Sequence, residues 1–100
     1  MKFKVGDIVK VKSLSEIKKL PCHQMDGGDI RGKCEDTDKF GNIITVHNTF
    51  IEDMFEFCGK EFVIERVDED GNYRLKNTIW SFIACWLERA QHYVETFDEE

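Results

Sequence analysis

The sequence predicts a mainly β protein, folded as a small β-barrel, because two segments resemble strands joined by tight turns. Near the start, KVGDIVKVKS alternates apolar and charged residues after a Gly6-Asp7 bend. Further along, CGKEFVIERVDEDGNYRLKNTIW holds a strand, an acidic Asp-Gly turn, a second strand and a tryptophan. Asp-Gly between two apolar runs is a strong hairpin signal. Closing such short strands into a barrel would hide the edges of the sheet.

The composition indicates one folded domain spanning residues 1–100. Apolar residues make up 41% and aromatic residues 12% of the chain, which is too much for a disordered protein. The formal net charge of −6 disfavours general binding to nucleic acid, which needs a basic surface. No apolar run approaches the roughly 20 residues that span a bilayer, and no signal peptide is recognised. We therefore expect a cytoplasmic protein with no membrane partner, whose four cysteines are reduced.

The first half of the chain predicts a strand, a short helix and an irregular segment. The strand covers Phe3 to Val11, with Val9 and Val11 on its dry face. Ser13 and Glu16 fit a capping box, which would start a helix that Pro21 ends. Residues 21–42 are the least regular part, either a long loop or an irregular hairpin between glycine turns.

The next stretch predicts a strand over 43–46 because it is rich in β-branched residues. Thr49 and Glu52 form a second candidate capping box, which would open a helix over 50–57. Gly59 suits the left-handed position after such a helix. We expect this helix to cover one open end of the barrel.

The remaining residues predict three short strands and a helical turn. The strands cover 60–67, 73–76 and 78–80, with the acidic turn at 68–72 between the first two, and the helical turn follows in SFIACWLERA. The tail is ambiguous, since residues 91–97 fit either a helix or a closing strand, and we favour the strand. The expected barrel interior is Val5, Val9, Val11, Phe62, Ile64, Leu75, and Trp80 or its neighbours.

The order of these motifs resembles small Src-homology-3-like (SH3-like) barrel proteins of bacteriophages and Gram-positive bacteria. The matching residues are Gly6-Asp7-Ile8-Val9, Gly59-Lys60, Ile64, Tyr73-Arg74-Leu75, Trp80 and Leu87-Glu88. The resemblance implies an SH3-like barrel with one or two short helices inserted in a long loop, and 21–42 as an irregular insertion. It implies no catalytic activity, and it suggests an accessory protein of a phage or mobile element.

Aromatic residues are the strongest functional signal, because SH3-like barrels can hold an extended peptide in an aromatic groove. Tyr73, Trp80, Phe82 and Trp86 are the candidate partner surface, although the two tryptophans equally fit the core. Acidic clusters at 35–38 and 68–70 would suit a basic partner. The sequence therefore predicts a non-catalytic protein- or peptide-binding module of unknown oligomeric state, with no cofactor.

A nucleic-acid-associated barrel is one alternative. Its basic surface would have to come from Lys10, Lys12, Lys18, Lys19 and Arg31. Binding through these residues should weaken steeply with salt.

A zinc-stabilised domain is a second alternative, because cysteine and histidine are the ligands that zinc selects. Cys22, His23 and Cys34 are the candidate ligands, with His47 and Cys58 as further soft ligands. The adjacency of Cys22 and His23 argues against this site, and no C-x-x-C pair occurs in the chain.

Catalysis by a cysteine would need a neighbouring base. Cys22-His23 and Cys34 with His47 qualify by residue type only, and the residues that follow Cys34 are acidic. Cys58 and Cys85 look structural. We therefore expect no enzyme.

Overall fold

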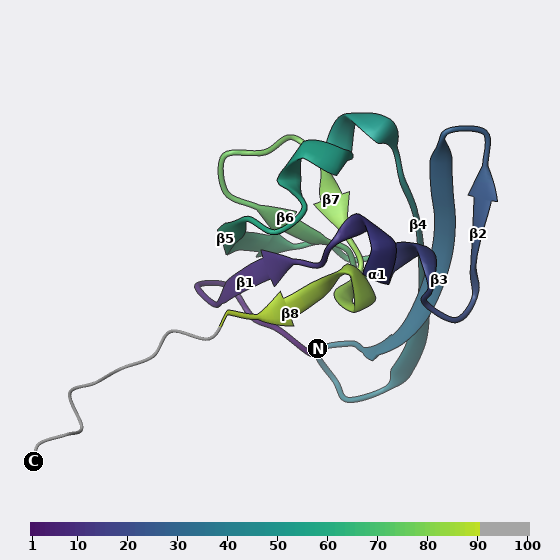
Figure 1. Cartoon of the computed structure of the whole chain (residues 1–100). Helices are drawn as coiled ribbons and strands as arrows, with labels where there is room; N and C mark the ends of the chain where they lie inside the picture. The colour runs from purple at the N-terminus through teal and green to yellow at the C-terminus, as the bar shows by residue number, and fades with distance from the viewer. Residues whose placement is uncertain (91–100) are drawn as a thin grey trace, which may run out of the picture.

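The structure is a computed structural model that describes residues 1–90. It contains two antiparallel sheets and short helices (Figure 1). One sheet has the order β7-β6-β5-β1-β8, with β1 (Ile8–Val11), β5 (Glu61–Val67), β6 (Tyr73–Leu75), β7 (Ser81–Phe82) and β8 (Leu87–Arg89). The other has the order β2-β3-β4, with β2 (His23–Asp26), β3 (Asp29–Thr37) and β4 (Ile43–Phe50). The helices are α1 (Leu14–Lys18) and the 3-10 helices η1 (Glu52–Phe57) and η2 (Ala84–Trp86). A mainly β fold is confirmed, but the two sheets do not form a closed barrel.

The first strand is shorter than expected because the chain bends at the predicted Gly6-Asp7 position. Gly6 has a φ of +94°, which glycine adopts without a steric penalty, and its N–H donates to the carbonyl of Ile64 at 2.9 Å. β1 begins only at Ile8 and lies between β5 and β8. Val5 precedes the bend and is 61% exposed, so its predicted place in the interior was wrong.

The first capping box is confirmed. The Ser13 hydroxyl accepts from the N–H of Glu16, and the Glu16 carboxylate accepts from the N–H of Ser13. The helix that follows is a single short one, ending before Lys19, and only its Ile17 is buried. This one apolar anchor attaches α1 to the core.

The irregular segment 21–42 forms a hairpin, one of the two alternatives that the sequence left open. β2 and β3 turn at Gly27-Gly28, and β3 and β4 turn at residues 38–42. The pairing of β3 with β4 runs without interruption from Ile30↔Phe50 to Thr37↔Ile43. β2 forms the outer edge of this sheet, as Figure 1 shows.

The second capping box does not form, and the expected helix over 50–57 is a shorter 3-10 helix. Thr49 and Phe50 belong to β4, because Phe50 is fully buried and pairs with Ile30. The N–H of Glu52 bonds the Asp29 carboxylate at 3.0 Å, so a residue from the hairpin replaces the local cap. Burial of one aromatic side chain has overridden the local signal here.

The hairpin of the five-stranded sheet is confirmed, but the third short strand was placed too early. The N–H of Asp68 donates to the Asn72 carbonyl at 2.8 Å across the acidic turn. Residues 78–80 belong to no strand; they follow a turn at 76–77, across which the Thr78 hydroxyl donates to the Leu75 carbonyl at 3.0 Å. The strand is instead β7, which pairs with β6 through Phe82 and Tyr73. A helical turn and then a strand follow as η2 and β8; the predicted strand over 91–97 lies outside the described residues.

One apolar core joins the two sheets. Its fully buried members include the predicted Val9, Val11, Ile64 and Leu75. Phe62 and Trp80 are only partly buried at its edge. The aromatic centre of the core consists of Phe50, Phe82 and Trp86, whose ring centroids lie 5.0–6.3 Å apart.

Candidate functional site

Three of the four residues of the predicted aromatic surface are buried. Tyr73, Phe82 and Trp86 are each 0% exposed, and only Trp80 of the four is partly exposed. The alternation of β6 turns Tyr73 inward, and Phe82 and Trp86 fill the space between the sheets. These three side chains cannot touch a partner, so the core interpretation of Trp86 holds.

An apolar groove lies elsewhere, with a volume of about 750 Å³. We define it by its apolar lining: Met1, Val5, Phe40, Ile44 and Val67. Phe40 is 77% exposed and Val5 61% exposed, which is unusual for such side chains in a folded domain. The N-terminus lies beside the turn between β3 and β4 in Figure 1, and these segments meet at the groove.

Asp36 holds the N-terminal wall of the groove in place. One of its carboxylate oxygens accepts from the N–H of Lys2 at 2.8 Å, and the other accepts from the Tyr73 hydroxyl at 2.6 Å. Burial and this hydrogen bond to Asp36 both raise the pKa of Tyr73, so the phenol stays a neutral donor. The Phe3 ring packs edge-on against Tyr73 at 5.6 Å and is buried. The acidic cluster predicted at 35–38 is therefore partly structural.

Asp38 fixes the turn that carries Phe40. Its carboxylate accepts from the N–H of Phe40 at 2.8 Å and from the N–H of Asn42 at 2.9 Å. The Asn42 N–H is the main cause that lowers the pKa of Asp38 below 3.8. Gly41 completes the turn with a φ of +86°. Phe40 is thus held outward by a well-bonded turn.

The β5–β6 side of the groove is acidic. Glu65, Asp68 and Glu69 line it, and Arg66 is paired with Asp68 at 2.8 Å. The segment before β1 contributes Lys4 to the lining, and the turn between β3 and β4 contributes Asp38 and Lys39. The groove therefore combines an apolar lining with one side, formed by β5 and the turn that follows it, whose carboxylates exceed its cations.

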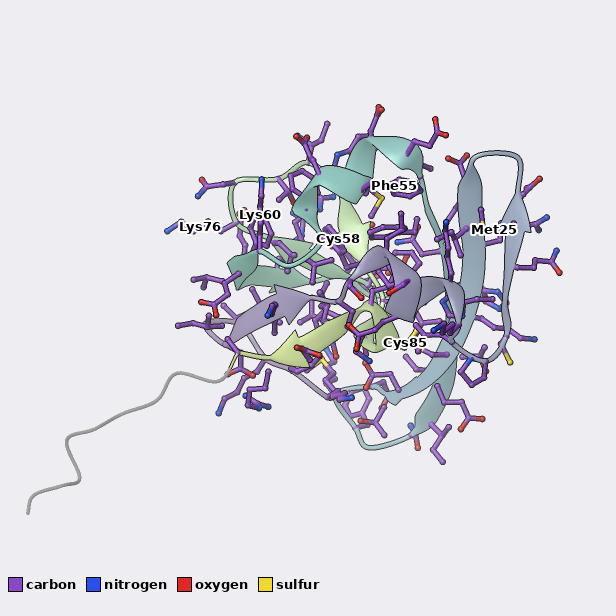
Figure 2. The ribbon with its side chains drawn as sticks, in the orientation of Figure 1. Met25, Phe55, Cys58, Lys60, Lys76 and Cys85 are labelled. Atoms are coloured by element: carbon purple, nitrogen blue, oxygen red, sulfur yellow. The ribbon has the colours of Figure 1, made fainter. Side chains whose placement is uncertain are left out.

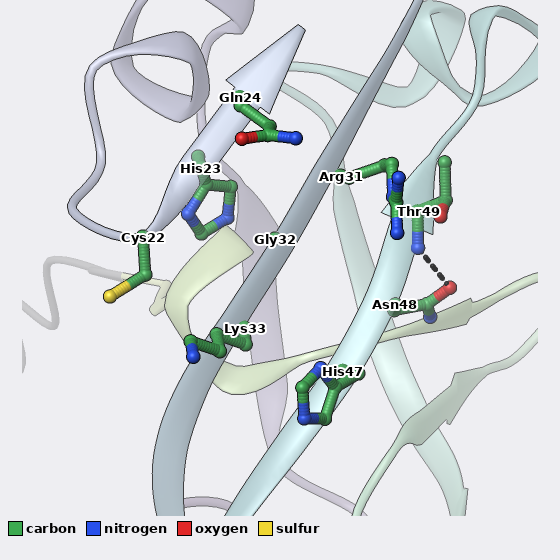
Figure 3. A pocket seen from close by; sticks show the side chains of 9 residues that line it. All are labelled: Cys22, His23, Gln24, Arg31, Gly32, Lys33, His47, Asn48 and Thr49. Carbon is green, nitrogen blue, oxygen red and sulfur yellow. Dashed lines mark hydrogen bonds between the residues drawn. The ribbon is translucent and has the colours of Figure 1, made fainter. Parts of the chain in front are cut away.

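Among the described residues, the candidate zinc ligands are not placed to hold one ion together. Trp86 Nε1 can only donate, so His23 Nε2 accepts its hydrogen bond at 2.9 Å. The other ring nitrogen, Nδ1, then carries the proton and donates to the Pro21 carbonyl at 2.8 Å. In Figure 3 the Cys22 sulfur points away from the His23 ring. Within residues 1–90, no three His, Cys, Asp or Glu side chains are placed to hold a metal ion.

Cys34 and His47 also do not form a catalytic pair. Cys34 lies opposite Val46 and His47 opposite Lys33 on neighbouring strands, so the two side chains occupy opposite faces of the sheet. Cys34 instead contacts the thiol of Cys85 in η2. Sequence reasoning missed this contact because the two cysteines are distant in the chain and neither belongs to a spaced motif.

The basic residues considered for nucleic acid are spread over several elements. Lys10 lies on β1, Lys18 ends α1, and Arg31 lies on β3. Arg31 lines a polar pocket of about 580 Å³ with Lys33 and His47, which Figure 3 shows in close-up. Its guanidinium is 3.7 Å from the Asp26 carboxylate, which offsets part of its charge.

Searches of protein-family models, curated proteins and solved structures found no significant match to this chain. Among residues 1–90, no helix is both long and apolar enough to cross a membrane.

Proposed function

We propose that this chain is a non-catalytic module that binds an extended peptide in the apolar groove. The observation that carries the proposal is that Phe40 and Val5, which are both largely exposed, line the same groove. An exposed apolar groove with a polar rim is typical of an interaction site. Because Asp36 and Asp38 fix its two walls by hydrogen bonds, the groove needs little ordering when it binds.

The charges of the rim favour a peptide with a basic residue beside an apolar anchor. Glu65 and Glu69 have no ion-pair partner among the described residues, whereas Arg66 is neutralised by Asp68. The overall charge of −6 favours a basic partner as well. An aliphatic or aromatic side chain would pack against Phe40, and a lysine or arginine would lie near the glutamates.

The fold supports the same proposal. A first strand, a long insertion, a hairpin, a helical turn and a last strand follow one another in the order that resembles SH3-like barrels. We extend the proposal to that fold class, and to a cytoplasmic protein whose thiols are reduced. In SH3 domains an aromatic groove binds a peptide that is already extended.

The test measures binding of two synthetic peptide pools by fluorescence anisotropy. Both pools carry a tryptophan or leucine anchor, flanked by lysines in one pool and by glutamates in the other. The lysine pool should bind wild type, and Phe40→Ala should weaken binding roughly 10-fold or more, as for an interface hot spot. Ile79→Ala is the matched control, since Ile79 is 76% exposed and does not line the groove.

The charge of the rim is tested by the double variant Glu65→Gln with Glu69→Gln. It should weaken binding of the lysine pool, because the attraction between the glutamates and the peptide lysines is lost. Binding should also depend less on salt concentration, because that attraction is the part of the binding energy that salt screens. Equal losses from Phe40→Ala and Ile79→Ala would remove the groove from the proposal. No binding of either pool, or preference for the glutamate pool, would reject the proposed partner.

A further inference from the structure

We propose that Cys34 and Cys85 form a redox-active thiol pair that a small-molecule disulfide oxidises to an intramolecular disulfide. This site lies apart from the apolar groove and is independent of peptide binding. Cys34 lies on β3 of the three-stranded sheet β2-β3-β4 (the hairpin sheet). Cys85 lies in η2, between β7 and β8 of the five-stranded sheet. Figure 2 labels Cys85 near the place where η2 meets β3. A bond between them would tie the two sheets together.

The surroundings of Cys34 favour its thiolate. Hydrogen bonding by the Cys85 thiol is the largest cause that lowers the pKa of Cys34, and backbone hydrogen bonding by Cys85 and Ala84 adds to it. Together they lower the pKa of Cys34 from 9.0 to about 7, although burial and the Asp36 carboxylate oppose the shift. The hydrogen bond given to Cys34 raises the pKa of Cys85, with burial and the charge of Cys34 adding to the effect. One member of the pair is therefore a poised nucleophile and the other holds the proton.

A crevice of about 540 Å³ gives a small molecule access to the pair. Both cysteines line it, together with Leu20, Pro21, Cys22, Lys33, Glu35 and Thr45. Both sulfur-bearing residues are partly exposed, so neither is sealed in the core. His23 contributes only a 3.8 Å contact from Nε2 to the Cys85 sulfur, because the Trp86 indole N–H already occupies that nitrogen.

The reaction is thiol–disulfide exchange in two steps. The Cys34 thiolate attacks one sulfur of the small disulfide, which forms a mixed disulfide on Cys34 and releases one small thiolate. Cys34 is then uncharged, so the repulsion that helped to keep Cys85 protonated is gone. Cys85 gives its proton to water and attacks the Cys34 sulfur, which releases the second small thiol. The two cysteines lose two electrons, and the small disulfide gains them.

The experiment incubates the full chain with oxidised glutathione and follows intact mass and peptide maps without reduction. Wild type should lose two hydrogens, with the crosslink mapped to Cys34 and Cys85. Cys85→Ser should accumulate a stable glutathione adduct on Cys34, because no second thiol can resolve it. Cys34→Ser should form neither product. Cys58→Ser is the control and should behave as wild type, since Cys58 does not line the crevice.

Two readouts need no cysteine variant. Oxidation of wild type should raise Tm by roughly 10 °C or more, because the crosslink closes a long loop in the unfolded chain. Alkylation of the reduced protein should modify Cys34 first, and its rate should rise with pH around an apparent pKa of about 7. The titratable and charged groups around the pair are Asp36, Glu35, Lys33, Lys12 and His23. A crosslink to Cys22, an unresolved adduct on wild type, or no reaction at all would overturn the proposal.

Discussion

The two sheets are attached to the core by different kinds of contact. The five-stranded sheet buries at least one apolar side chain on every strand, and alternating pairs on β1 and β6, such as Val9 and Val11 on β1. The hairpin sheet buries one apolar residue on β3, two on β4 and none on β2. Its polar attachments include hydrogen bonds between His23 and Trp86, Asp29 and Glu52, Asp36 and Tyr73, and Asn48 with Asn72 and Ser81.

This difference shows that the contacts that stabilise the fold are not the same as those that position the hairpin sheet. Apolar burial is non-directional and supplies most of the free energy of folding. Hydrogen bonds between partly buried groups add less, but they fix where one element lies on another. The hairpin sheet carries both the Phe40 wall of the groove and the Cys34 thiol, so polar contacts position both proposed sites.

The largest expected effect comes from Phe50→Ala, which removes the main apolar anchor of the hairpin sheet. Phe50 is fully buried and its ring lies 5.0 Å from that of Trp86. Loss of a buried phenylalanine costs about 3–5 kcal/mol. Urea unfolding measures the change, with Phe40→Ala as the exposed control, which should stay within about 0.5 kcal/mol of wild type. A loss below about 1 kcal/mol would mean that the hairpin sheet is not anchored by this ring.

Gly32→Ala should have a smaller effect through one polar attachment. A Cβ at this position would overlap the His23 imidazole, which lies directly over the glycine. The ring must then move, and the buried Trp86 indole N–H loses its acceptor, at a cost of about 1–3 kcal/mol. Urea unfolding gives the cost, and the indole N–H resonance reports the lost bond.

A double-mutant cycle separates the ring from the backbone. In the His23→Ala background, Gly32→Ala has no imidazole to displace, so its cost should largely disappear. If the alanine is equally destabilising in both backgrounds, the close packing of ring and glycine is not its cause.

Sequence reasoning performed well where side-chain alternation and local turns decide the structure. The Ser13 capping box, the Asp68–Asn72 turn and the inward position of Leu75 all formed as expected, whereas Tyr73, predicted on the partner surface, also faces inward. It failed where contacts with residues distant in the chain determine the local structure. Thr49 and Glu52 carry a valid capping pattern, but burial of Phe50 keeps the chain extended, and Asp29 supplies the cap.

The sites were harder to predict than the fold, because each depends on contacts between segments far apart in the chain. Trp86 and Phe82 have the composition of a binding surface, yet packing between the sheets buries them. Phe40 sits in a polar turn where no periodicity marks it, and its exposure depends on the bonds of Asp38. The Cys34–Cys85 contact exists only once β3 lies against η2.

The smallest expected effect is a local pH dependence at the Phe40 turn. Because the N–H groups of Asn42 and Phe40 lower the folded pKa of Asp38 below 3.8, its contribution to stability is present above pH 3.8. That contribution is lost as the pH falls through the lowered folded pKa, when the carboxylate is protonated and accepts weaker hydrogen bonds. The amide resonances of Phe40 and Asn42 should shift in this range in wild type and stay flat in Asp38→Asn. Asp7 and Glu16 also have lowered pKa values, so the difference between the two proteins isolates Asp38. If both proteins titrate alike at these amides, another group holds the turn, and the outward position of Phe40 needs a different cause.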